Sequence, residues 1–268
     1  MTELTATATP SAPLAASFDT SVLRGAVVIL PTVSTGNVPQ LAADLLVSSL
    51  AEPGAPSMVR LGELFSPYVL SVCGPDAFGV SGRACMPIEV YYSAHRHLAI
   101  VQMRAPVIAG YGSAFAESFY ALAAATGVAQ VLLLSSADAA YRTDALMDST
   151  PAFRHLALGS NAKSLDLSPA AVPVLEDQFH DGRLKGTGYL PALLAAARTH
   201  EHAMATDLVL VVTLEGDNLP DTMLLFARLA AVLEATQKGV APIRALLPVS
   251  WAELYGGGVT DELLRAVY

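Results

Sequence analysis

Short, uninterrupted apolar runs constrain this chain more than any other feature of its sequence. The clearest examples are Ala26 to Leu30, Val131 to Leu134 and Leu208 to Leu214, each bounded by polar or turn residues. A membrane span needs roughly 20 apolar residues, whereas a strand buried on both faces of a sheet needs only about four to eight. These runs therefore predict buried strands, and we expect no membrane partner.

Amphipathic segments lie between the apolar runs, as in Val38 to Leu50, where leucines recur at helical spacing. Helices are also expected over 113–125, 191–205 and 219–237, strands over 24–30, 58–64, 128–134 and 208–214, a hairpin of 88–92 with 98–103, and irregular structure over 138–188. This alternation predicts an α/β fold, a single-domain three-layer α/β/α sandwich with a mostly parallel central sheet and one antiparallel hairpin.

The N-terminal segment sets the expected domain boundaries and location. Its first 17 residues contain no Lys or Arg and are mostly small, so they match neither a secretory signal nor a transit peptide. We expect a disordered N-terminal tail over 1–20, an α/β domain over 21–258 and a C-terminal tail over 259–268. The expected location is the cytoplasm and nucleus.

Composition narrows the possible partners. The formal net charge is -9, so no basic stripe is available to neutralise phosphates, and nucleic-acid binding is not expected. Hydrophobic residues make up 53% of the chain, which predicts apolar surface that another protein covers. Cys73 and Cys85 could form a disulfide only with their Cα atoms within about 7 Å, and two free thiols are expected.

Two motifs suggest a cofactor or a metal but have the wrong spacing. Gly110 to Phe115 follows a strand and opens a helix, as a dinucleotide-binding loop does, yet the third glycine is missing. His200 and His202 are two residues apart, whereas a zinc protease needs two histidines four apart on one helical face. We therefore expect an ordinary helix entry, surface histidines, and neither cofactor nor metal.

Polar residues after two of the predicted strands suggest catalysis. Ser135 and Ser136 follow one strand but lack the flanking glycines of a hydrolase nucleophile turn. Glu215, Asp217 and Asp221 follow another strand, where they could bind a hard cation or cap the start of a helix. The capping interpretation is favoured because Asn218 and Pro220 also mark a helix start.

Three segments resemble the proteasome assembly chaperone 2 family. Leu30 to Leu46 contains a Ser-x-Gly-Asn-Val-x-Gln-Leu loop before a helix, Leu214 to Asp221 contains Glu-Gly-Asp-Asn-x-Pro-Asp, and Pro248 to Gly257 contains Pro-x-Ser-Trp-x-x-Leu. Each motif is moderately specific alone, but all three occur in the family's order. The stretch from Pro151 to Gly188 matches poorly.

This resemblance implies a phosphorylase-like fold, no enzymatic activity, and a chaperone that pairs with proteasome assembly chaperone 1. The heterodimer would scaffold the α-ring of the 20S proteasome core particle and bind its α subunits. The motif residues would then be structural: Gly36, Asn37, Gly216, Asp217, Asn218 and Trp251.

The alternative hypothesis is a phosphorylase-like or hydrolase-like enzyme with Ser34, Asn37, Glu215 and Asp217 around one pocket. Such an enzyme would require a base and an anion-binding site. The sequence has no group of Arg or Lys residues near these loops.

The chain ends in Ala266-Val267-Tyr268. Some assembly chaperones insert a C-terminal hydrophobic-tyrosine motif between α subunits, although there the tyrosine is penultimate. Val267 and Tyr268 are therefore candidate partner-binding residues. The alternative is a short helix end that packs on the domain or its partner.

Overall fold

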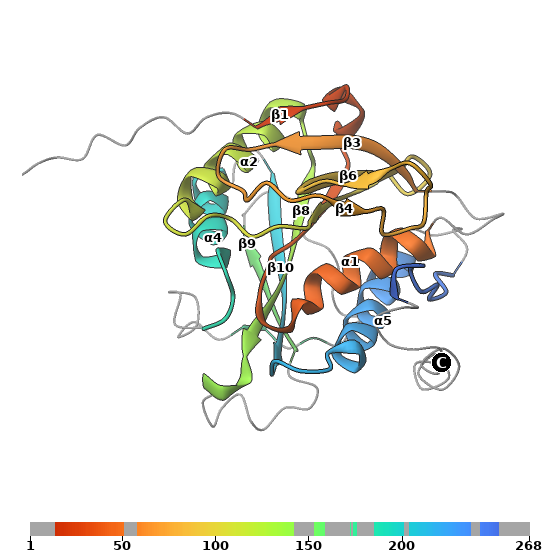
Figure 1. Ribbon diagram of the computed structural model, residues 1–268. Coiled ribbons are helices and arrows are strands. Elements are labelled where there is room, and N and C mark those ends of the chain that lie inside the picture. Colours follow the sequence, from red (N-terminus) through yellow and green to blue (C-terminus); the bar gives the residue numbers. More distant parts are fainter. Residues whose placement is uncertain are drawn as a thin grey trace, which may run out of the picture.

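The computed structural model describes residues 14–50, 58–141, 153–158, 172, 174–175, 185–200, 204–236 and 242–251. Within these residues an eight-stranded sheet has helices on both faces (Figure 1). The strands are β1 (Ala15–Ala16), β2 (Val27–Pro31), β3 (Val59–Phe65), β4 (Gly74–Pro75), β5 (Ala84–Cys85), β6 (Ile88–Ser93), β7 (Leu98–Met103), β8 (Gln130–Asp138), β9 (Phe153–Leu158) and β10 (Ala205–Thr213). The helices are α1 (Val38–Ser49), α2 (Gly112–Thr126), α4 (Leu190–Thr199) and α5 (Leu219–Thr236), with short 3-10 helices η1 (Thr20–Leu23), η2 (Thr35–Asn37) and η3 (Ala139–Tyr141).

The sheet has the strand order β1-β3-β6-β7-β2-β8-β10-β9, and β4 pairs with β5 in a separate ribbon. Its centre is parallel, because β2 runs parallel to β7 and β8, and β8 runs parallel to β10. The flanking strands β1, β3, β6 and β9 pair antiparallel to their neighbours. The predicted α/β sandwich with a parallel centre and a β6–β7 hairpin is confirmed, and the antiparallel part extends beyond that hairpin.

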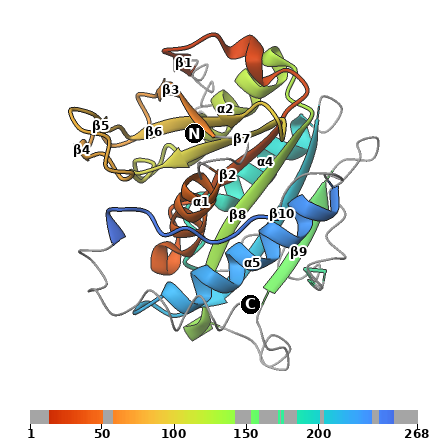
Figure 2. The ribbon, with the colours of Figure 1, turned by 90° about the vertical axis from the view of Figure 1, so that its right-hand side faces the viewer.

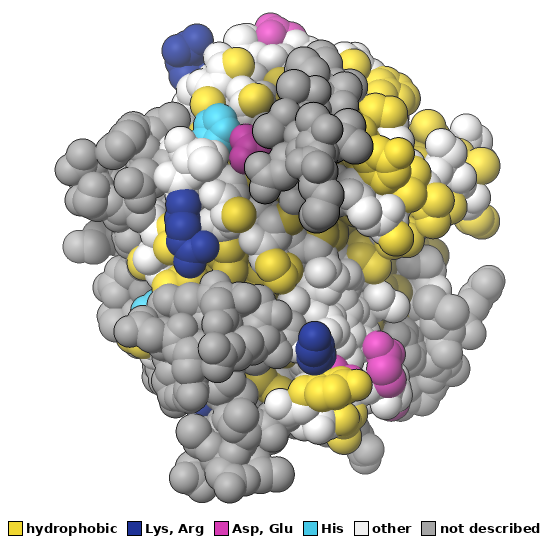
Figure 3. All heavy atoms as spheres, turned by 90° about the vertical axis from the view of Figure 1, so that its left-hand side faces the viewer, with side chains coloured by type: hydrophobic (Ala, Val, Ile, Leu, Met, Phe, Trp, Pro, Cys, Tyr) yellow, Lys and Arg dark blue, Asp and Glu magenta, His cyan; other side chains and the backbone are white. Residues whose placement is uncertain are grey.

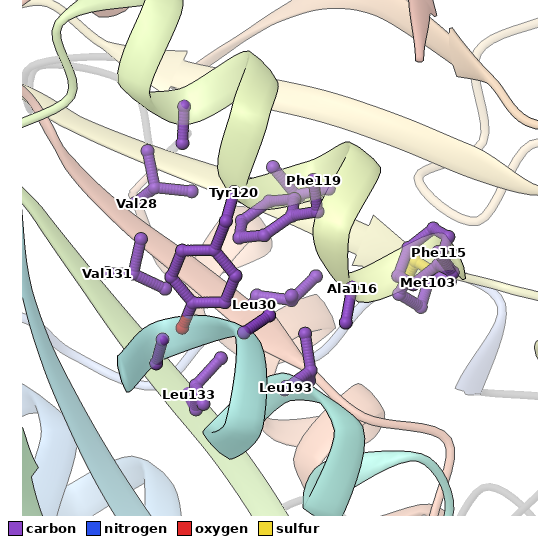
Figure 4. Close-up of a cluster of buried hydrophobic side chains, with 14 of the residues drawn as sticks. Val28, Leu30, Met103, Phe115, Ala116, Phe119, Tyr120, Val131, Leu133 and Leu193 are labelled. Carbon is purple, nitrogen blue, oxygen red and sulfur yellow. The ribbon is translucent and has the colours of Figure 1, made fainter. Parts of the chain in front are cut away.

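Alternating side chains of the central strands fill two separate cores. Val28 and Leu30 of β2 face the layer of α2 and α4, whereas Ile29 faces the layer of α1 and α5. Figure 4 shows the first core, where Phe119 and Tyr120 of α2 lie over Val28, Leu30 and strand β8. Figure 2 shows α1 and α5 packed side by side on the opposite face. Burial on both faces explains why the strand sequences are continuously apolar.

Three predicted segments differ in the structure. The strand predicted over 128–134 continues to Asp138 and contains Ser135 and Ser136, because their hydroxyls find hydrogen-bond partners inside the sheet. The stretch expected to be irregular contains β9, whose apolar pattern is interrupted by a buried Arg154. The helix predicted to end at Ala205 ends at Thr199, and Ala205 begins β10.

The described chain begins in the sheet. Ala15 and Ala16, which the sequence assigned to the N-terminal tail, pair with Phe65 and Leu64 of β3. The predicted C-terminal tail over 259–268 lies outside the described residues. No described helix is long and apolar enough to cross a membrane. Cys73 and Cys85 are both free, as predicted.

A buried ionic cluster ties α1 to the sheet. The Arg104 guanidinium donates to both carboxylate oxygens of Asp44 on α1, at 2.9 and 3.0 Å, and to Glu89 of β6 at 2.5 Å. Arg60 of β3 lies 3.1 Å from the other oxygen of Glu89, and Gln102 of β7 donates to Asp44 at 2.8 Å. Glu89 is fully buried. Burial alone would lower the pKa of Arg104, but Asp44 and Glu89 raise it well above its ordinary value.

The C-terminal part of the described chain covers α1 from outside. Residues 242–251, here named the strap, run across α1 (Figure 2), and the Leu246 N–H donates to Ser49 Oγ at 3.0 Å. The strap ends at Trp251, which is buried in the core beneath α1 and α5. Helix α1 is consequently enclosed by the sheet, α5 and the strap.

We predict that Arg104→Leu lowers the free energy of unfolding by about 3–5 kcal/mol, because it leaves Asp44 buried without its cation and removes one of the two cations that contact Glu89. The exposed Arg198 in the last turn of α4 provides the control. Arg198→Leu should change stability by no more than about 0.5 kcal/mol. Urea denaturation followed by circular dichroism measures the stability of both variants. A loss for Arg104→Leu as small as that for Arg198→Leu would show that the cluster is dispensable.

Candidate functional site

Two of the three motif segments meet where the parallel strands end. The loop after β2 forms η2, and the loop after β10 runs from Leu214 to Asn218. The Gly36 N–H donates to the Glu215 carboxylate at 3.1 Å. Because the carboxyl ends of parallel strands are where α/β enzymes place their active sites, this edge of the sheet is the candidate functional site.

A cluster of hydroxyl groups joins the ends of β2 and β8. Thr32 Oγ1 lies within hydrogen-bond distance of the Oγ atoms of Ser135, at 2.9 Å, and Ser34, at 3.1 Å, and the Oγ atoms of Ser34 and Ser136 lie 2.7 Å apart. Ser136 donates in turn to the Thr35 carbonyl at 2.5 Å. Thr32, Ser135 and Ser136 are fully buried. The four hydroxyls therefore satisfy one another and the loop backbone, and among the described residues none of them contacts a His, Lys or carboxylate that could act as a base.

Asn218 organises the second loop. Its amide nitrogen donates to the Leu214 carbonyl at 2.7 Å and to Thr213 at 2.8 Å, while its oxygen accepts from the Gly216 N–H at 3.2 Å. Asp217 accepts from the Leu219 N–H at 3.2 Å, at the start of α5. Thr213 donates to Asp221 at 2.5 Å. These polar side chains act as turn and cap residues, which agrees with the capping interpretation.

The two loops fit together through a glycine. Gly36 has a φ of +67°, and a Cβ atom at this position would lie 2.6 Å from the Asn218 side chain. The segment before α4 adds a second close contact, because the Thr35 N–H donates to the Gly186 carbonyl at 2.9 Å. A Cβ atom on Gly186 would lie 2.0 Å from Thr35 Oγ1. The carboxyl edge is thus a set of interlocked loops.

The four residues of the enzyme hypothesis do not converge on one reacting atom. Ser34 is bonded within the hydroxyl cluster, Glu215 accepts from Gly36, and Asp217 accepts from the backbone of α5. The sequence predicts Asn37 as the N-cap of the helix over 38–50, and Asn37 does occupy the N-cap position of α1, but its side chain makes no capping hydrogen bond. The reason is its left-handed backbone, with φ at +53°, which differs from the extended backbone of a capping residue.

The remaining sequence motifs bring no chemistry to this edge. Gly110 and Gly112 line a hollow of about 270 Å³ beside Val33 and Tyr189, and no charged residue appears in its described lining. His200 lies 3.3 Å from Glu117, while His202 is outside the described residues. No group of three potential metal ligands occurs in the described part of the chain.

We predict that Gly36→Ala destabilises the protein more than Gly110→Ala does. Both glycines have positive φ, but a Cβ atom on Gly110 would meet nothing within 4 Å. Backbone strain alone should therefore cost about 1–2 kcal/mol at Gly110, whereas displacement of Asn218 should add at least about 1 kcal/mol at Gly36. Urea midpoints measure the difference, and equal losses would contradict the interlocking of the loops.

Comparison with known proteins identifies the family. Residues 28–236 match the model of the PAC2 family. Proteasome assembly chaperone 2 of Nematostella vectensis is 33% identical over 239 residues, which cover 84% of this chain and 96% of that protein. The Homo sapiens protein of the same name is 29% identical over 261 residues, covering 90% of this chain and 96% of its own.

A solved structure has the same fold. PbaA of Pyrococcus furiosus, an archaeal homolog of proteasome-assembly chaperone, aligns with a TM-score of 0.57 and 18% identity, over 85% of this chain and 87% of PbaA. The likeness to PbaA concerns the fold alone. The family model matches residues 28–236, a range that includes helices of both faces and the strands of the central sheet. The chain belongs to the PAC2 family.

Proposed function

We propose that this protein is a proteasome assembly chaperone subunit. It pairs with proteasome assembly chaperone 1, and the heterodimer scaffolds assembly of the α-ring of the 20S core particle. It acts by binding rather than by catalysis, in the cytoplasm and nucleus. The observation that carries this proposal is the similarity to proteasome assembly chaperone 2 over most of the chain, which covers nearly all of those relatives.

The candidate site supports a binding role. A nucleophile needs a base to accept its proton, and the hydroxyl cluster at the carboxyl edge is occupied by its own members and the backbone. Glu215 and Asp217 likewise hold backbone N–H groups. The polar residues of the family motifs therefore stabilise loops, as structural motif residues would.

Exposed apolar side chains support protein partners. Phe65, Leu70 and Val72, on and after β3, are about half exposed. Figure 3 shows hydrophobic side chains gathered at the upper right of the face beside α2 and α4. Contiguous apolar surface of this kind is typical of protein-protein interfaces.

Affinity purification of the tagged protein at its native expression level tests the proposal. We expect co-recovery of proteasome α subunits together with a second chaperone, without mature proteasome in equal amount. Recovery of neither α subunits nor a second chaperone would contradict the function.

The C-terminal motif generates a separate prediction, although Val267 and Tyr268 lie outside the described residues. Deleting both should weaken binding of the heterodimer to the α-ring by about tenfold, near 1.4 kcal/mol, if the tyrosine ring and terminal carboxylate insert between subunits. The heterodimer itself should remain intact in size-exclusion chromatography. Unchanged ring affinity would leave the folded surfaces as the docking site.

A further inference from the structure

A hollow of about 600 Å³ lies between the end of α1, strand β3, the 76–83 turn and the strap. We name it the strap hollow. It is lined by Val47, Ser48, Met58, Val59, Arg60, Phe78, Val80, Arg83, Tyr91, Leu246, Leu247 and Val249. It lies on the α1 layer, away from the loops at the carboxyl ends of β2 and β10.

Four aliphatic side chains in this lining are uncovered. Val59 is 50% exposed, Val80 46%, Leu246 43% and Val249 65%. Single exposed apolar residues are ordinary on a protein surface, but four around one hollow form an apolar surface that binding would remove from water. The hollow therefore offers hydrophobic binding energy that the isolated chain leaves unused.

The charged residues in the described lining are both arginines, Arg60 and Arg83. Their carboxylate partners do not line the hollow: Glu89 has a fully buried side chain, Asp76 is almost fully buried, and Glu63 pairs with Arg60 from β3. The Arg60 side chain is only 9% exposed, and its Nε–H has no acceptor in the described part of the chain. Both guanidinium groups are thus paired with carboxylates behind them, and the described lining presents N–H donors but no carboxylate to an occupant.

The walls of the hollow are held in place without a partner. Asp76 accepts from the N–H groups of Phe78 and Val80, at 2.9 and 3.1 Å, and forms an ion pair with Arg83. The strap is fixed through Ser49 at one end and by the Ser250 N–H donating to the Ala77 carbonyl at 3.2 Å. A preformed site lowers the entropic cost of binding.

We propose that the strap hollow is a docking site for a segment of another protein that carries aliphatic side chains on either side of a carboxylate. The aliphatic side chains would cover Val59, Leu246 and Val249, and the carboxylate would face the two guanidinium groups. A second copy that presents the same hollow fits poorly, because it would bring guanidinium donors and no carboxylate acceptor. The inference goes beyond the proposed function and does not depend on it.

Short capped peptides test this chemistry on the full-length protein. The probe alternates leucine and valine around a central glutamate, and matched peptides carry glutamine or lysine at that position. Fluorescence anisotropy should show the glutamate peptide binding at least about tenfold more tightly than the lysine peptide. Equal affinity for the two, or no binding of the glutamate peptide at about 1 mM, would overturn the proposal.

Two matched variants locate the binding. Leu246 and Leu224 are both 43% exposed, but only Leu246 lines the strap hollow, since Leu224 lies on α5. Leu246→Asp should weaken glutamate-peptide binding at least about tenfold, and Leu224→Asp should leave it unchanged. Unchanged urea midpoints establish that both variants fold, and equal effects on binding would place the peptide elsewhere.

Other occupants give distinct results. Binding that appears only after deletion of residues 252–268 would assign the hollow to the chain's own C-terminal segment and overturn the proposal. Concentration-dependent self-association that Leu246→Asp abolishes would assign it to a second copy, with the same consequence.

Discussion

The bidentate pairing of Arg104 with Asp44 fixes where α1 lies on the sheet, and other parts of the structure follow from that position. The loop that enters α1 carries Gly36 to the Asn218 loop, and the end of α1 carries Ser49 to the strap. Both the interlocked carboxyl edge and the strap hollow therefore depend on one helix. A buried ion pair adds little net stability over an apolar pair, but it penalises any shift that separates its members.

The sequence allowed prediction of the elements whose signals are local. Val27 to Leu30 is continuously apolar because both faces of β2 are covered, and Gly127 ends α2 in the left-handed conformation that is common for a glycine after a helix. Strand β9 was missed because Arg154 interrupts its pattern, and its burial depends on neighbours distant in sequence. The cluster of Asp44, Glu89 and Arg104 was missed for the same reason, since no spacing rule links three charges from separate elements.

The candidate site was predicted in part. The motif residues Gly36 and Asn218 meet as structural residues, and the reason is a three-dimensional contact that their own motifs do not contain. Asn37 shows the limit of such inference, because an asparagine before a helix is read as a cap unless its φ is known. Ser135 and Ser136 looked like residues after a strand because their hydroxyls suit a loop, yet Thr32 and Ser34, which follow β2, provide hydrogen-bond partners for them inside β8.

The two surfaces that α1 organises differ in what they leave available for binding. At the carboxyl edge the hydroxyls of Ser34 and Ser136 already have partners, so a ligand would exchange existing hydrogen bonds for new ones with little net gain. At the strap hollow, apolar side chains face water and the Arg60 Nε–H lacks an acceptor among the described residues. Covering those apolar side chains, and supplying an acceptor to that already buried N–H, would gain free energy without breaking an internal contact. Of the two surfaces that α1 organises, the binding capacity left unused among the described residues therefore lies at the strap hollow and not at the ends of the parallel strands, where this fold places enzyme sites.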